Sequence, residues 1–292
     1  MFFGRTNILS QWFQDKITTY IHANLPGYIY KCLTEAGSMN LELFLAVCLV
    51  TSQVSAHASD WDRFTFAQEW PQTTCMLGKK EKKTCVIPPS ITSFVIHGLW
   101  PSSGSSEGPT NCSGPAFNMD TIKNLTSELN NSWPNLYTNT PLIDFWRHEW
   151  EAHGRCALTL KTTGTEYLFF RKTLDIMAKF NISRSLNQAN VIPDDSKLYS
   201  VNNVMAALNK ILGVKTNLQC FSSSYENIRA GKHQYLAEIR ICMTKTFQLI
   251  SCTDNKDTNV YFKSKKKAYT EPCRGKFTFP QIKRNLLYDY NL

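Results

Sequence analysis

The sequence lacks a long apolar segment, an internal repeat and a low-complexity bias, and each absence excludes a class of protein. No apolar run approaches the roughly 20 residues of a membrane-spanning helix, which excludes a multispan membrane protein. The composition also excludes a collagen-like repeat, a coiled coil and a disordered tail protein. What remains is 292 residues, 42% of them hydrophobic, with ten cysteines and a formal net charge of +9. These values indicate a basic, cysteine-rich globular protein with enough apolar residues for a core.

An export signal would explain the cysteines, because disulfides persist outside the reducing cytosol. Residues 39–58 have the features of a signal peptide: the apolar stretch from Leu41 to Val50 is too short to span a bilayer, and small residues follow it. A buried N-terminal helix is the alternative interpretation. We expect residues 1–38 to be an upstream extension outside the fold, and residues 59–292 to be the domain, ending in a mobile basic tail.

Removal of the leader leaves the net charge at +9, because three basic and three acidic residues are lost together. Eight cysteines remain, an even number that allows 105 disulfide pairings. Four N-x-S/T sequons are consistent with passage through the secretory pathway. We therefore expect a secreted, glycosylated and disulfide-bonded protein. The glycosylation candidates are Asn111, Asn124, Asn130 and Asn181.

The mature chain shows strand and helix patterns without a regular βαβ alternation, which indicates one domain of the α+β class. Expected strands cover Phe64–Trp70, Ser93–His97 (ended by Gly98), Tyr235–Cys242 and Thr258–Phe262. Expected helices cover Asp120–Asn130, Leu142–His153, Glu166–Phe180 and Asn202–Leu212.

Histidine is scarce, with six residues in the chain, yet three of them fall in two short segments rich in tryptophan. His97 ends a predicted strand, and His148 and His153 lie with Glu149 on a predicted helix. A zinc-hydrolase site is disfavoured, because histidines at positions i and i+5 lie about 140° apart around a helix of 3.6 residues per turn. We expect no metal and no cofactor.

Glu149 and His153 are spaced by four residues, so the carboxylate is placed to hold the imidazole. Two histidines facing each other across a cleft suit acid–base proton transfer. The basic charge attracts a polyanion. Together these features indicate RNA cleavage with the ribose 2′-hydroxyl as the nucleophile. The alternative, core histidines beside core tryptophans, does not explain the clustering. Stacking surfaces are offered by Trp100, Trp146 and Trp150.

The segments FVIHGLWP (residues 94–101) and FWRHEWEAHGRC (residues 145–156) resemble the paired active-site motifs of the ribonuclease T2 family. Similarity extends from about residue 60 to residue 279. The resemblance implies an α+β fold with a central antiparallel sheet flanked by helices. It also implies the disulfides Cys75–Cys85, Cys112–Cys156, Cys220–Cys273 and Cys242–Cys252.

By the same resemblance, His97 and His153 are the acid–base pair, with His153 taking the 2′-hydroxyl proton and His97 protonating the 5′-oxygen, or the reverse. His148 binds the phosphate, and Glu149 stabilises the charged transition state. Trp100 stacks on a base. The implied product is a 2′,3′-cyclic phosphate that is partly hydrolysed to a 3′-phosphate.

Four positions depart from the family pattern. Ala152 stands where the family usually has a lysine, which removes a cation expected beside the phosphate. Arg155 is a candidate to restore that charge. Ser102 replaces an acidic residue, which leaves the base preference open, and Lys215 stands where proline is frequent.

Two basic runs, residues 79–83 and 263–267, are either extra phosphate contacts or solvated loop lysines. The expected protein is a monomeric, secreted or endolysosomal ribonuclease that cleaves single-stranded RNA and not DNA, with no membrane span. The alternative function is a secreted glycoprotein that binds cell-surface polyanions or glycan receptors, with weak or dispensable catalysis.

Overall fold

The computed structural model describes residues 61–103, 108–223, 233–253 and 270–284. They belong to one compact unit, Ser59–Leu292. The predicted leader, the upstream extension, the strand at Thr258–Phe262, the basic run at residues 263–267 and most of the tail lie outside the described residues. Within the described part of the chain, no helix is both long and apolar enough to cross a membrane.

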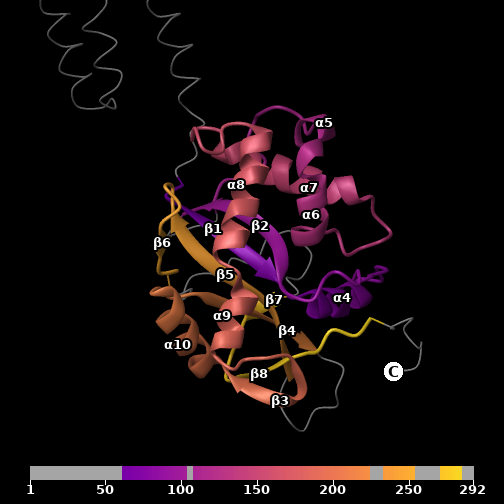
Figure 1. Ribbon diagram of the computed structural model, residues 1–292, viewed down its shortest axis with the longest axis vertical. Coiled ribbons are helices and arrows are strands. Elements are labelled where there is room, and N and C mark those ends of the chain that lie inside the picture. Colours follow the sequence, from indigo (N-terminus) through magenta and orange to yellow (C-terminus); the bar gives the residue numbers. More distant parts are fainter. Residues whose placement is uncertain (1–60, 104–107, 224–232, 254–269, 285–292) are drawn as a thin grey trace, which may run out of the picture. The chain divides into compact units, whose positions relative to one another are not determined.

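One twisted sheet organises the domain (Figure 1). Its strands pair in the order β2-β1-β5-β4-β7, all antiparallel, and a short parallel bridge joins β8 to β5. This arrangement confirms the α+β class and the central antiparallel sheet. The described strands are β1 (Arg63–Glu69), β2 (Val95–Ser102), β3 (Asp194–Ser200), β4 (Asn217–Ser223), β5 (His233–Thr244), β6 (Leu249–Ile250), β7 (Thr270–Pro272) and β8 (Lys276–Phe279).

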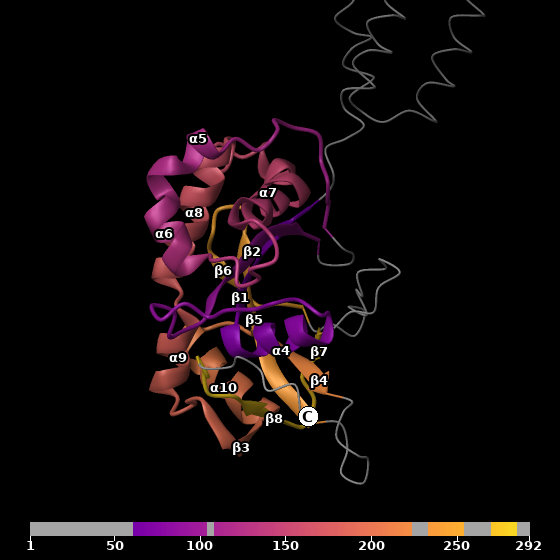
Figure 2. The same ribbon diagram turned by 90° about the vertical axis from the view of Figure 1, so that its right-hand side faces the viewer.

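Most of the helices gather at the two ends of the sheet, and α4 lies between these two groups (Figures 1 and 2). Helices α5 to α8 lie together at one end, and α9 and α10 lie at the other, beside β3 and β8 (Figures 1 and 2). The described helices are α4 (Pro71–Lys80), α5 (Met119–Ile122), η1 (Lys123–Leu125), α6 (Thr126–Ser132), α7 (Leu142–Ala152), η2 (Gly154–Ala157), α8 (Glu166–Lys179), α9 (Ile182–Gln188) and α10 (Val201–Leu212).

The helix boundaries follow local capping chemistry. Thr165 caps α8 by accepting a hydrogen bond from the Leu168 amide, and Gly213 ends α10 with φ +76°, a conformation that favours glycine. Pro71, which follows the expected strand Phe64–Trp70, occupies the first position of α4, where its missing N–H costs no helical bond. The helix predicted over Asp120–Asn130 is instead three short elements, α5, η1 and α6.

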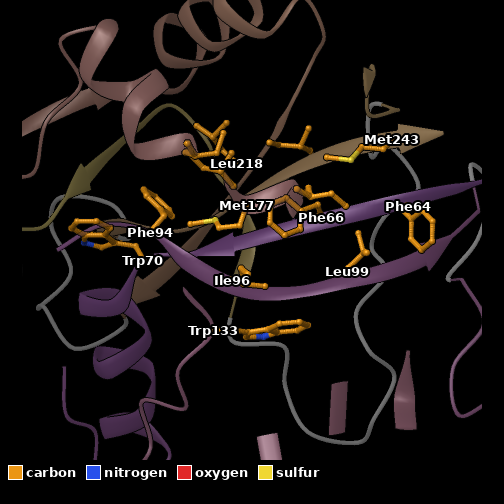
Figure 3. Close-up of a cluster of buried hydrophobic side chains, with 14 of the residues drawn as sticks. Phe64, Phe66, Trp70, Phe94, Ile96, Leu99, Trp133, Met177, Leu218 and Met243 are labelled. Atoms are coloured by element: carbon orange, nitrogen blue, oxygen red, sulfur yellow. The ribbon is translucent and has the colours of Figure 1, made fainter. Parts of the chain in front are cut away.

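The hydrophobic core lies on the face of the sheet that α8 covers, which we call the α8 face. Phe64 and Phe66 of β1 are fully buried there, and Figure 3 shows them with Leu99 of β2 and Met177 of α8. Because side chains alternate along a strand, Thr65 and Ala67 of β1 point to the opposite face.

Trp146 and Trp150 are core residues, which corrects their expected role as stacking surfaces. Both are fully buried, and their indole N–H groups donate to the carbonyls of Trp133 and Pro115. Their rings therefore pack in the protein interior, and Trp100 is left as the half-buried tryptophan of the two motifs.

All four expected disulfides are present: Cys75–Cys85, Cys112–Cys156, Cys220–Cys273 and Cys242–Cys252. The second ties the loop before α5 to η2, directly after the second histidine motif, and the fourth ties β5 to the segment after β6. A disulfide of this kind typically contributes about 2–4 kcal/mol, chiefly by restricting the unfolded chain.

Candidate active site

His97 is placed by a β-bulge in β2. Ala67 of β1 pairs with Gly98, whereas the next residue, Gln68, pairs with Ile96, so His97 is the extra residue between them. The strand therefore does not end at Gly98, as the sequence suggested, but continues to Ser102. A bulge redirects one side chain out of the alternation of its strand. The Trp133 indole N–H donates to the His97 carbonyl at 2.9 Å and holds the bulge in place.

Gly98 allows the two motifs to approach each other. A Cβ atom at this position would overlap the Glu149 carboxylate and the Trp100 indole nitrogen. Those two groups are hydrogen-bonded to each other, with Trp100 Nε1 donating to Glu149 Oε2 at 3.1 Å. The absence of a side chain at Gly98 is therefore a steric requirement of the site.

The helix α7 ends one residue before His153, which changes the geometry expected for the second motif. His153 has φ −126° and ψ −49°, so the helical-wheel separation does not apply to it. The rings of His148 and His153 are 5.9 Å apart between centroids. The expectation that the i, i+5 spacing would keep the two imidazoles from reaching one metal ion is therefore wrong.

His148, Glu149 and His153 form the one group in the described residues with metal-ligand geometry. Their ligand atoms lie within 4.8 Å of one another. His148 is exposed, whereas Glu149 and His153 are buried. The group has the donor atoms to hold a cation. The same atoms can hold a phosphate through a protonated imidazole, and the charge states decide between these uses.

The charge state of His97 is set by a carboxylate from β5. His97 Nδ1 lies 2.5 Å from Glu238 Oε1, and the other oxygen of Glu238 accepts a hydrogen bond from Arg240 Nε at 2.6 Å. Burial disfavours the imidazolium, but the Glu238 carboxylate outweighs burial and raises the pKa of His97 to about 9. For Glu238, burial is outweighed by the Arg240 and His97 charges, which lower its pKa to about 2.

In contrast to His97, the two histidines of the second motif have lowered pKa values. Burial, together with the charges of His148 and His97, lowers the pKa of His153 to about 3. Burial and the His97 charge also lower the pKa of His148. Burial raises the pKa of Glu149 to about 7, against the opposing effects of His97 and the Trp100 hydrogen bond.

Trp100 lies close to both histidines that were predicted as acid and base. Its ring centroid is 5.0 Å from that of His97 and 5.6 Å from that of His153. The Arg240 guanidinium carbon lies 5.4 Å from the same indole, within cation–π distance. The structure thus brings together the predicted site residues His97, Trp100, His148, Glu149 and His153.

Glu238 and Arg240 were missed by the sequence analysis. They lie 141 and 143 positions after His97, but β5 pairs with β1, and Arg240, Ala67 and Gly98 align across three strands. The sequence pattern of β5 could have indicated these two residues. Glu238 and Arg240 alternate with the buried Ile239 and Ile241 in a strand pattern, which places two charges together on the face away from the core.

The structure shows the surroundings of Ala152 and Arg155, two of the positions that depart from the family pattern. Ala152 is buried at the end of α7. The Arg155 guanidinium pairs with Glu151 at 2.7 Å and donates to the Pro115 carbonyl at 2.9 Å. The Arg155 charge is thus already paired with Glu151, whereas the Arg240 guanidinium contacts the site residue Trp100.

The sequon asparagines differ in accessibility. Asn111, Asn124 and Asn130 are exposed. Asn181 is half-buried, and its side chain caps α9 by accepting a hydrogen bond from the Arg184 amide. The first three therefore offer a free side-chain amide more readily than the fourth.

This chain is similar to several known ribonucleases. Residues 61–252 match the model of the Ribonuclease T2 family. The chain is 40% identical over 228 residues to Ribonuclease Oy of Magallana gigas, across 77% of this chain and 99% of that protein. It is 32% identical over 197 residues to Ribonuclease T2 of Sus scrofa, across 67% of this chain and 90% of that protein.

Solved structures show the same fold. The crystal structure of human RNase T2 superposes with a TM-score of 0.59 at 25% identity, covering 76% of this chain and 99% of that one. Ribonuclease MC1 from bitter gourd seeds superposes with a TM-score of 0.59 at 27% identity, covering 75% of this chain and 100% of that one.

Proposed function

This chain belongs to the ribonuclease T2 family and is an endoribonuclease of the T2 type, and we propose that it cleaves single-stranded RNA by transesterification without a metal ion. The observation that carries the proposal is the opposite electrostatic setting of two histidines that both lie next to Trp100. His97 is held charged by Glu238, whereas His153 is held neutral by burial and by neighbouring positive charge.

This asymmetry supports one of the two role assignments that the motifs left open. Neutral His153 accepts the proton of the ribose 2′-hydroxyl, and the 2′-oxygen attacks phosphorus. As the bond from phosphorus to the 5′-oxygen breaks, charged His97 donates its proton to that oxygen. The products are a 2′,3′-cyclic phosphate and a free 5′-hydroxyl. In the second step the roles reverse, and water opens the cyclic ester to a 3′-phosphate.

The phosphate binds beside three further groups. His148 is exposed on α7, and a bound phosphate favours its protonated form. Glu149, linked to Trp100, is close enough to His148 and His153 to stabilise their charged forms during the reaction. Arg240 supplies a cation on the β5 side of Trp100, which compensates in part for alanine at position 152.

The working enzyme begins near residue 59, after removal of a signal peptide at residues 39–58. It acts as a monomer outside the cell or in endolysosomes. Four disulfides support the location outside the cytosol, because such bonds persist in oxidising compartments. Asn111, Asn124 and Asn130 are the glycosylation sites best supported by exposure. Asn181 is a weaker candidate because it caps a helix.

The test is incubation of the purified protein with single-stranded RNA, and separately with DNA of the same sequence, in the presence of a chelator. We expect cleavage of RNA alone, because DNA lacks the 2′-hydroxyl, and mass spectrometry should find 2′,3′-cyclic phosphate ends that convert to 3′-phosphates. Cleavage that requires an added metal, or equal cleavage of DNA, would contradict the mechanism.

A further inference from the structure

A second charged feature lies outside the catalytic cluster. It is a groove of about 530 Å³ formed by the second half of α8, the segment after η2 and the turn between β5 and β6. Four lysines line it, and we call it the lysine groove. They are Lys161, Lys172, Lys179 and Lys245.

The positive charge of the lysine groove is not neutralised by its surroundings. Among the described residues, none of the four lysines takes part in an ion pair. Asp175, the acidic residue of the lining, accepts a hydrogen bond from Arg171 Nε at 2.9 Å and is already paired. Four like charges around one hollow repel each other, and a bound anion with several charges relieves that repulsion.

The framework that carries the lysines is ordered. Phe247 stacks on the core residue Phe64, with ring centroids 5.1 Å apart. The Lys172 ammonium lies 5.3 Å from the centroid of the Phe247 ring. The turn that presents Lys245 is closed by Thr244, whose hydroxyl accepts hydrogen bonds from two backbone amides. The backbone that carries Lys172 and Lys245 is thus held by α8 and by this turn.

The lysine groove and the catalytic groups lie on opposite faces of the sheet. Phe247 packs on Phe64, which belongs to the α8 face. Glu238, Arg240 and Gly98 align with Ala67 and Glu69 on the other face. An anion in the groove is therefore not the phosphate that is cleaved.

The chemistry of the groove favours the backbone of a nucleic acid over its bases. Ammonium groups are point charges that bind phosphate without the paired geometry of arginine. The groove's phenylalanines, Phe180 and Phe247, have lysine ammonium groups at 5.0 and 5.3 Å from their rings, so these rings are poorly available for base stacking. This combination suits binding that is independent of sequence.

We propose that the lysine groove is a second binding site for the RNA strand, which holds backbone phosphates distant from the bond that is cleaved. This proposal rests on the proposed function, because it takes RNA as the ligand. A long strand would occupy both sites, whereas a dinucleotide would occupy the catalytic site alone. The groove should therefore affect affinity for long RNA without affecting the chemical step.

The experiment compares the wild-type chain with the double variant Lys172→Gln/Lys245→Gln. The control is Lys210→Gln/Lys276→Gln, which removes the same charge at exposed positions on α10 and β8. Binding of a long 2′-O-methyl RNA, which cannot be cleaved, is measured by fluorescence anisotropy over a range of salt concentrations. Circular dichroism verifies that each variant is folded, and Lys172→Arg/Lys245→Arg should restore binding.

We expect the groove variant to raise the Kd for the long strand several-fold and to flatten the plot of log K against log salt by about 1.4, or about 0.7 for each lysine lost. The value of kcat/KM for a dinucleotide should not change. Equal Kd values and salt slopes in the groove and control variants would overturn the proposal. So would a loss of affinity for a sulfated oligosaccharide with no loss for RNA.

Failure of the groove and failure of the proposed function give different results. If the groove does not bind RNA, the wild-type chain still produces cyclic phosphate ends and the two double variants behave alike. If the chain does not cleave RNA as proposed, those ends are absent, but binding of the 2′-O-methyl strand is still measured and still differs between the variants.

Discussion

The two faces of the central sheet carry charge in opposite ways. On the face opposite the α8 face, which we call the catalytic face, His97, Glu238 and Arg240 form a chain of hydrogen bonds, and Glu238 is almost completely buried. On the α8 face, the lysines of the groove have no acidic partner among the described residues. Paired, buried charge is fixed before substrate arrives and controls where protons reside. The charges of the groove lysines have no such acidic partners, so salt screens them. We expect them to affect the affinity for RNA and not the chemical step.

The largest expected effect is the loss of His97, the proposed proton donor, on the catalytic face. His97→Phe should lower kcat for RNA cleavage by about 10²–10⁴-fold, the range of a general acid, because no group then protonates the leaving oxygen. Cleavage is measured with a fluorescent oligonucleotide at neutral pH.

The matched control is His233→Phe. His233 lies on β5 outside the site and is hydrogen-bonded to Thr278. This variant should keep its activity if it is folded, as judged by circular dichroism. A folded His97→Phe protein with wild-type kcat would show that His97 is not the acid.

A smaller effect is expected when the partner of His97 loses its charge. Without the Glu238 carboxylate, the groups around His97 are the carboxylates of Glu69 and Glu149, the Arg240 guanidinium, and the imidazoles of His148 and His153, whose own pKa values are lowered. Glu238→Gln should therefore return the pKa of His97 from about 9 toward its ordinary value or below it.

Because the acid is active only when protonated, the alkaline limb of the kcat profile should move to lower pH. If the pKa of His97 returns to about 6.5, kcat at pH 8 falls by about 30-fold, whereas kcat at pH 5 changes little. The exposed Glu128→Gln variant serves as the control. An unshifted alkaline limb in Glu238→Gln would show that Glu238 has only a structural role.

The smallest effects belong to the α8 face. The groove variants should alter Kd and its salt dependence and leave the pH profile unchanged. The reverse result, a groove variant with a shifted pH profile, would remove the distinction between the two faces.

The parts of the fold that the sequence predicted well are those with local causes. The α8 helix has a threonine cap and a periodic apolar face, and α10 ends at a glycine in the left-handed region. The four disulfide pairings came from resemblance to the ribonuclease T2 family, because eight cysteines alone do not select one pairing.

The features that sequence reasoning missed depend on contacts between distant strands or on the last turn of a helix. The bulge at His97 is visible only in the register of β1 and β2. The partnership of His97 with Glu238 requires β5 to pair beside β1, across 141 positions. The wrong inference about His148 and His153 arose because α7 ends at Ala152, one residue earlier than the periodicity suggested.

The central claim is that the two histidines are held in opposite charge states before substrate binds. NMR titration of the imidazole resonances in the free enzyme measures this directly, with His97→Phe and His153→Phe used for assignment. We predict that His97 stays protonated up to a pH near 9 and that His153 stays neutral down to a pH near 3. Titration of both rings together near pH 6.5 would contradict the assignment of His97 as acid and His153 as base.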